Sequence, residues 1–295
     1  MPDAMSHLTE GGSGDRSSLS PELIDLLDSA LARHEAASNP NTQRAYRLGW
    51  ESFISFCQEN SLSPLPATPQ TVVAYMEHLA VQGYAYNTID TWLSAIAAVH
   101  TEKHEENPCQ SQPVRRQRKN LRRTMDLTTD QKKPLLLGHL REIVEGMDVT
   151  DLTAVRDRAV LLLGFAGAFR RSELVGLDVG DIRDVRGGKV ILIRQSKTDQ
   201  DGQGTIKQIP DDVAFHSPND AVDAWLQASG IQSGPVFRMV DRWGNVRDKR
   251  LSGRSVAKIV KKYVSRIGEN PSRFGAHSLR AGFLTQGYVD GVGDH

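Results

Sequence analysis

The stretch GAFRRSELVGL, residues 167–177, is the most informative part of this sequence about the fold, because it joins two predicted helices and carries candidate functional residues. It completes LLLGFAGAF (161–169), the longest apolar run, which suits a buried helix and is too short to span a membrane. SELVGL then predicts the start of an amphipathic helix, with Ser172 as a candidate cap. Arg170 therefore stands between two helices, and Glu173 lies three residues on, where a carboxylate can orient the guanidinium or bond to the backbone.

Two later stretches carry further candidate residues. GGKVILIRQSKTDQDGQGTIKQIPD (187–211) predicts a strand, a Gly-rich turn and a second strand, with Lys197 at the tip. AHSLRAG (276–282) predicts a helix start that carries His277 and Arg280 three residues apart, hence on one face. A helix N-terminus also favours an anion, so this pair could hold one phosphate.

These residues suit the activation of a phosphodiester. Breaking that bond without a metal requires that the charge on two non-bridging oxygens is neutralised and that the leaving alkoxide receives a proton. Guanidinium groups are planar, permanently charged and bidentate, so Arg170 and Arg280 suit the first task, and a loop lysine such as Lys197 suits the second. Each residue alone also has a plain structural reading. Arg170 could form a surface ion pair, and Lys197 could lie solvated at the tip of a hairpin. A lone HxxR pair such as His277 and Arg280 is common and carries little information by itself.

The order of these motifs resembles the tyrosine site-specific recombinases, the phage integrase family. The resemblance rests on G-x-x-R-x-S-E-L, a strand-borne lysine and then H-S-L-R-A-G. It implies that Arg170 is the first catalytic arginine, Glu173 a supporting acid and Lys197 the general acid, with His277 and Arg280 as the His-x-x-Arg pair. It also implies attack by a tyrosine to give a 3′-phosphotyrosyl link, which needs no metal, ATP or other cofactor.

The first part of the chain reads as helical and extends the resemblance. Apolar residues recur at helical spacing in four segments from Ser20 to about His104, which predicts a small bundle. These segments resemble the SAM-like core-binding domain of Cre-type recombinases. We therefore expect a mainly α fold, with a helical bundle followed by an α+β catalytic domain that has a small antiparallel sheet. The expected divisions are a disordered leader (1–19), the core-binding domain (20–108), a basic segment and linker (109–134) and the catalytic domain (135–295).

Basic residues gather in two blocks although the formal net charge of the 295 residues is zero. Residues 112–124 hold six Arg or Lys and no acid, and residues 247–266 are similarly basic around one acid, Asp248. Either block alone could be a solvated face, whereas two blocks indicate a double-stranded DNA partner. The candidate phosphate contacts are Arg115, Arg116, Arg118, Lys119, Arg122, Arg123, Arg254, Lys258, Lys261 and Lys262. Helices from Asn87 and over 252–266 are candidates for reading bases.

The cysteines, the N-terminal residues and the family resemblance indicate the redox chemistry, the cellular location and the assembly to expect. Cys57 and Cys109 match no metal or disulfide spacing, so we expect neither. The N-terminal residues lack an apolar signal core, which predicts an intracellular, cytoplasmic protein. The expected DNA partner makes it nucleoid-associated. The family resemblance implies tetramers on paired DNA sites, and we leave open whether this chain forms them.

The nucleophile is missing from the sequence pattern. The resemblance predicts a Gly-His or Gly-Trp motif and a tyrosine after Arg280, and the residues that follow contain neither arrangement. Tyr288 lies eight residues on, about 12 Å along a helix, so we expect it to pack the last helix rather than attack. The chain as given is therefore expected to bind DNA without cleaving it. The alternatives are a non-catalytic regulator that occupies recombination sites, and a helical transcription factor with an accidental HxxR.

Overall fold

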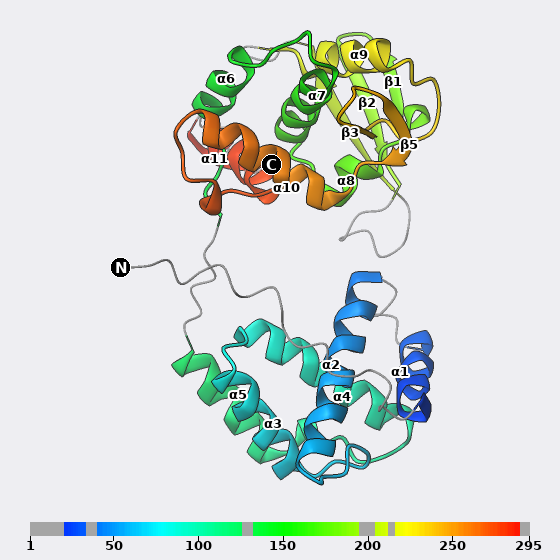
Figure 1. Cartoon of the computed structure of the whole chain (residues 1–295), viewed down its shortest axis with the longest axis vertical. Helices are drawn as coiled ribbons and strands as arrows, with labels where there is room; N and C mark the ends of the chain where they lie inside the picture. The colour runs from blue at the N-terminus through cyan, green and yellow to red at the C-terminus, as the bar shows by residue number, and fades with distance from the viewer. Residues whose placement is uncertain (1–20, 34–39, 126–131, 195–203, 212–215, 290–295) are drawn as a thin grey trace. The chain divides into compact units, whose positions relative to one another are not determined.

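The computed structural model describes residues 21–33, 40–125, 132–194, 204–211 and 216–289. The chain divides into two compact units, Met1–Thr129 and Asp130–His295, and each has its own hydrophobic core. Figure 1 shows helices in the first unit, and helices with small sheets in the second. The predicted fold class, mainly α with a small antiparallel sheet, is confirmed.

The first unit is a bundle of helices. Its described α-helices are α1 (Pro21–Arg33), α2 (Pro40–Glu59), α3 (Pro69–Val81), α4 (Tyr86–Glu102) and α5 (Gln112–Thr124). Aromatic side chains join α2 to α3, because the rings of Phe53 and Tyr75 meet edge-on with centroids 5.1 Å apart. The Thr-Pro sequence starts α3 as it predicts, since the Thr68 hydroxyl accepts a hydrogen bond from the N–H of Thr71.

The basic segment 112–124 is a helix that belongs to the first unit. Val114 and Leu121 are buried seven residues apart on α5, one stripe of a helix, and α5 packs against α3. The segment that we assigned to a basic stretch and linker therefore contributes to the core of the first unit.

The second unit is built around α7 (Leu152–Ala166), whose apolar residues are buried on several sides. Its other described α-helices are α6 (Leu137–Glu145), α8 (Arg171–Gly176), α9 (Pro218–Ser229), α10 (Gly253–Arg266) and α11 (His277–Val289). α9 packs along α7, and α6, α8, α10 and α11 also contact it. The apolar run 161–169, most of which lies in α7, is thus at the centre of this unit.

Two small antiparallel sheets complete the second unit. One has the order β1–β2–β3 and the other pairs β4 with β5, and their bounds are β1 (Ile182–Val185), β2 (Gly188–Ile193), β3 (Thr205–Pro210), β4 (Arg238–Val240) and β5 (Val246–Arg250). The predicted pair of strands is β2 with β3. The sequence reasoning missed β1, β4 and β5, because these short strands are largely exposed and lack an apolar alternation.

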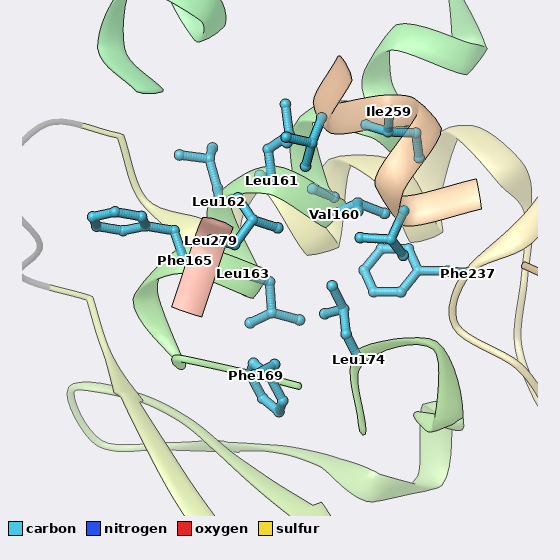
Figure 2. Close-up of a cluster of buried hydrophobic side chains, with 14 of the residues drawn as sticks. Val160, Leu161, Leu162, Leu163, Phe165, Phe169, Leu174, Phe237, Ile259 and Leu279 are labelled. Atoms are coloured by element: carbon cyan, nitrogen blue, oxygen red, sulfur yellow. The ribbon is translucent and has the colours of Figure 1, made fainter. Parts of the chain in front are cut away.

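The core of the second unit reaches the residues beside the candidate site. Figure 2 shows Phe169, Leu174 and Leu279 in the same apolar cluster, and these residues adjoin Arg170, Glu173 and Arg280 in the sequence. Gly164 lets the elements close, since a Cβ there would lie 2.9 Å from Leu279 and 3.0 Å from Leu174. Close packing of the neighbours therefore fixes where the polar side chains emerge.

Candidate active site

A tight turn at the end of α7 organises the site. The N–H of Ala168 bonds to the carbonyl of Phe165, and that of Phe169 bonds to the carbonyl of Gly164, which is the hydrogen-bond pattern of a Schellman motif. Ala168 takes the left-handed conformation, with φ of 45°, although glycine is the usual residue at that position. The turn leaves the carbonyls of Gly167 and Ala168 available as acceptors and carries the chain directly to Arg170.

Arg170 and Glu173 bind each other twice. The N–H of Arg170 donates to Glu173 Oε2 at 2.9 Å, and its guanidinium Nη1 donates to Oε1 at 2.7 Å. The Glu173 side chain is 2% exposed, so this carboxylate is held in place. Both roles expected of Glu173 are therefore present. The predicted Ser172 cap is wrong, because Arg170 itself occupies the N-cap position and Glu173 supplies the capping carboxylate.

Arg280 reaches the same turn from the last helix. Its Nη1 donates to the carbonyl of Ala168 at 2.6 Å, across 112 residues of sequence. The start of α11 is anchored, since buried Ser278 accepts from the N–H of Gly275 and its carbonyl accepts from the N–H of Leu135. Gly282 permits that approach, because a Cβ there would lie 1.9 Å from the Leu135 carbonyl oxygen. The Ser and Gly of the HSLRAG motif thus position its Arg.

Of the other two predicted site residues, the structure describes one, His277. His277 is the first residue of α11 and is exposed, one helical turn before Arg280 as expected. Lys197 lies outside the described residues. Of the predicted set, the structure therefore brings Arg170, Glu173 and Arg280 together at one turn, with His277 on the same helix as Arg280.

Lys207 of β3 is a cation of the site that sequence reasoning missed. Its Nζ donates to the carbonyls of Gly167 and of Ala168, the latter at 3.3 Å, and lies 4.6 Å from the centroid of the Phe169 ring. Burial lowers the pKa of Lys207, with further lowering by Arg280 and Arg170. A sequence signal existed, because Lys207 and Ile209 are two apart on a strand and so share a face, and Ile209 is core.

The cluster is strongly cationic and suited to an anion. Arg170, Lys207 and Arg280 gather beside one buried carboxylate, that of Glu173. Main-chain carbonyls at the C-terminal end of α7 hold two of these cations, where the helix dipole is negative. The arrangement can neutralise the oxygens of a phosphodiester while two guanidiniums fix its orientation.

The two basic blocks lie mostly on exposed helix faces. On α5 the exposed cations are Arg115, Arg116, Lys119, Arg122 and Arg123, and on α10 they are Arg254, Lys258, Lys261, Lys262 and Arg266. Two of the predicted contacts are engaged within the protein. Arg118 Nε and Nη2 donate to Asp90 at 2.9 and 2.5 Å, and Lys262 lies 3.4 Å from Asp157. On α5, Arg116, Lys119 and Arg123 line a shallow groove beside Val73 of α3.

The sequence of the second unit contains two tyrosines, Tyr263 and Tyr288. Tyr263 is buried, accepts a hydrogen bond from Lys262 Nζ at 3.2 Å, and burial raises its pKa. Tyr288 lies on α11 eight residues beyond Arg280, about 12 Å along the axis. The expectation that Tyr288 packs the last helix is wrong, since it is 81% exposed.

The part of the chain that the structure describes contains no group of three or more His, Cys, Asp or Glu side chains that could hold a metal ion. Within the same ranges, every helix is too short or too polar to cross a membrane.

Several solved structures share the fold of this chain. The XerH site-specific recombinase bound to palindromic difH substrate matches with a TM-score of 0.62 and 15% identity, over 92% of this chain and 75% of that one. The Tn1549 transposon integrase in complex with transposon right end DNA matches with a TM-score of 0.61 and 18% identity, over 91% and 87%. At these identities the likeness shows the fold.

Sequence relatives carry the comparison further. Tyrosine recombinase XerC of Pseudomonas entomophila (strain L48) is 28% identical over 268 residues, which cover 87% of this chain and 79% of the relative. The integrase/recombinase XerD homolog of Selenomonas ruminantium is 37% identical over 262 residues, 87% of this chain and 76% of the relative. The family model for the phage integrase family matches residues 137–295. This chain therefore belongs to the phage integrase family of tyrosine recombinases.

Proposed function

We propose that this chain binds double-stranded DNA and acts in site-specific recombination, with its second unit activating a phosphodiester. The observation that carries the proposal is the gathering of Arg170, Arg280 and Lys207 at one turn, next to the buried carboxylate of Glu173. The names of the relatives support it, since they are recombinases, and the two solved neighbours described above are complexes with DNA substrates.

Each residue has a chemical role in this proposal. Arg170 and Arg280 hold the non-bridging oxygens of the scissile phosphate, and Glu173 orients Arg170 through its two hydrogen bonds. Lys197 gives a proton to the leaving 5′-oxygen, and His277 donates a hydrogen bond to the phosphate from the start of α11. A tyrosine attacks phosphorus and forms a 3′-phosphotyrosyl link, which conserves the bond energy, so the reaction needs neither metal nor ATP.

The exposed cations of α5 and α10 supply the phosphate contacts that position the protein on the duplex. Such contacts carry no base information and make the affinity salt-dependent. α4 and α10 are the helices proposed to read bases in the major groove. Recombination joins two sites, so copies of the chain meet on DNA, and the family resemblance makes a tetramer the assembly to test. The proposed location of such a protein is the cytoplasm, in association with the nucleoid.

The tyrosines lead to a finer proposal about the polypeptide of 295 residues. Tyr263 is buried and Tyr288 is about 12 Å along α11 from Arg280, so we expect this polypeptide to bind DNA without a covalent adduct. A second candidate function is a non-catalytic protein that occupies recombination sites and regulates an active recombinase. The cationic cluster and the exposed cations of α5 and α10 are equally compatible with it.

Selection of bound duplexes from a random DNA pool, followed by footprinting, tests the DNA function. We expect one preferred site. Arg170→Ala and Arg280→Ala should each remove protection at one internucleotide position and leave the flanking footprint in place. Arg186→Ala, an exposed arginine in the turn between β1 and β2, is the matched control and should change nothing. If no duplex is enriched, or if both variants give the same footprint as the unaltered protein, a recombinase-type phosphate pocket is contradicted.

A covalent-adduct test checks whether this polypeptide cleaves DNA, and an adduct would also exclude the non-catalytic function. The selected site is prepared with a nick that traps a phosphotyrosyl product, and the mixture is resolved on a denaturing gel. A protein–DNA band that Tyr288→Phe abolishes would show that this polypeptide cleaves and would overturn the finer proposal. Binding without a band supports it.

A further inference from the structure

Lys207 contacts the main chain that carries the site. It projects from β3, and its Nζ donates to two consecutive carbonyls of the turn that ends α7, those of Gly167 and Ala168. The Phe169 ring, 2% exposed, lies against the ammonium with its centroid 4.6 Å from Nζ. Lys207 thus contacts three successive residues, 167 to 169, that lead into Arg170.

Lys207 shares one acceptor with Arg280. The Ala168 carbonyl accepts from Arg280 Nη1 at 2.6 Å and from Lys207 Nζ at 3.3 Å, so both of its lone-pair directions have a donor. This carbonyl belongs to a residue with φ of 45°, a conformation that a non-glycine residue adopts only when its surroundings hold it. A donor from β3 and a donor from α11 together supply that hold.

We propose that Lys207 is a positioning residue, which fixes the turn at 167–169 and through it sets the two guanidiniums of Arg170 and Arg280 for one phosphate. The inference rests on the proposed function in naming a phosphate as the ligand. It does not rest on that function for the effect of Lys207 on the arginines.

The physical need for such a residue follows from the charges. Arg170 and Arg280 repel each other, and the carboxylate of Glu173 binds Arg170. The Ala168 carbonyl is the partner that the structure gives to the Arg280 guanidinium, so its direction decides where Arg280 points. Without the Lys207 donor, the turn keeps its hydrogen bonds to α7 but loses the two hydrogen bonds that tie it to β3.

The experiment follows the arginine side chains directly. The full chain is labelled with ¹⁵N and ¹³C at arginine, and the guanidinium signals of Arg170 and Arg280 are assigned by substitution. Inorganic phosphate at low ionic strength is the ligand probe. The variants are Lys207→Met, which keeps length without charge, Lys207→Arg, which keeps charge, and Lys103→Met, a matched control at an exposed lysine of the first unit.

We expect Lys207→Met to shift and broaden the Arg280 and Arg170 signals and to weaken phosphate binding about tenfold, the size of one charge-assisted hydrogen bond. Lys207→Arg should restore most of both, and Lys103→Met should change neither. A general loss of packing would instead affect the Lys207→Arg and Lys207→Met proteins alike. Unchanged arginine signals in a folded Lys207→Met protein would overturn the inference.

A measurement on the unaltered protein decides the matter if Lys207→Met does not fold. Burial and the two arginines lower the pKa of Lys207, so it loses its proton before exposed lysines do as pH rises. The ¹³Cζ and ¹⁵Nε chemical shifts of Arg280 should change with that titration. Chemical shifts that stay constant while Lys207 loses its proton would overturn the inference. If the arginines respond but no variant binds phosphate, the positioning role stands and the proposed function fails.

Discussion

Helix α5 and the turn at 167–169 both gather arginine and lysine, but they hold these side chains in opposite ways. The cations of α5, apart from Arg118, project from an exposed helix face. At the turn, Lys207 and Arg280 donate to main-chain carbonyls and Arg170 donates to a buried carboxylate. Exposed, adaptable cations suit non-specific attraction to phosphates, whereas fixed ones suit a single geometry. The same residue types therefore serve affinity in one region and positioning in the other.

The largest effect is expected where backbone packing holds the fixed cluster. Gly282→Ala places a Cβ 1.9 Å from the Leu135 carbonyl oxygen and should destabilise the chain by about 3 kcal/mol through overpacking. Urea unfolding measures it. Gly287→Ala on the same helix is the control, because nothing lies within 4 Å of that Cβ, and it should stabilise by about 0.5 kcal/mol. Equal effects of the two substitutions would contradict the close approach.

Glu173→Gln should remove the acid that holds the cluster. The amide keeps one acceptor but loses the charge that binds both the N–H and the guanidinium of Arg170. We expect a loss of about 2 kcal/mol in the free energy of unfolding. Glu145→Gln at the exposed end of α6 should change it little. If Glu173→Gln were as mild as the control, the cluster would not depend on its carboxylate.

The α5 cations should affect binding and leave stability unchanged. Replacing Arg116, Lys119 and Arg123 together by Gln should weaken DNA binding about tenfold and lower the slope of log affinity against log salt by about 3. Arg118→Gln in the same helix is the matched control. Because Arg118 pairs with Asp90, it should lower stability by about 0.5 kcal/mol and leave the salt slope unchanged. A reduced slope for Arg118→Gln would place that residue among the DNA contacts.

The smallest effect concerns acid and the scaffold of the first unit. Burial lowers the pKa of His100 below 6.5, and its ring is held neutral between the Ala67 N–H and the Ile96 carbonyl. The unfolded chain takes a proton that the folded chain refuses, so stability is full above pH 6.5 and falls below it. The slope is at most about 1.4 kcal/mol per pH unit. His100→Gln should flatten that slope in unfolding experiments from pH 7.5 to 5.5, and exposed His104→Asn should not.

Sequence reasoning succeeded where a residue and its function are local. The apolar run before Arg170, the three-residue spacing of Arg170 to Glu173 and that of His277 to Arg280 all place side chains through helix geometry alone. It failed at one local choice between two neighbouring residues and at one remote partner. Ser172 was the better cap by residue type, yet the buried carboxylate of Glu173 took that role because it also meets the guanidinium. Lys207 binds carbonyls 39 and 40 residues away, which no local pattern contains.

The sequence by itself determined the family, the helical first unit, the paired strands and the choice of Arg170, Glu173, His277 and Arg280 as candidates. Residue type and short-range spacing carry that information, since helices and strands repeat with fixed periods. Only the tertiary structure decided that Arg280 and Lys207 meet at the Ala168 carbonyl, that Arg118 is bound to Asp90, and that Tyr288 is exposed. These outcomes depend on which surfaces pack together, because packing brings distant parts of the chain within hydrogen-bond reach.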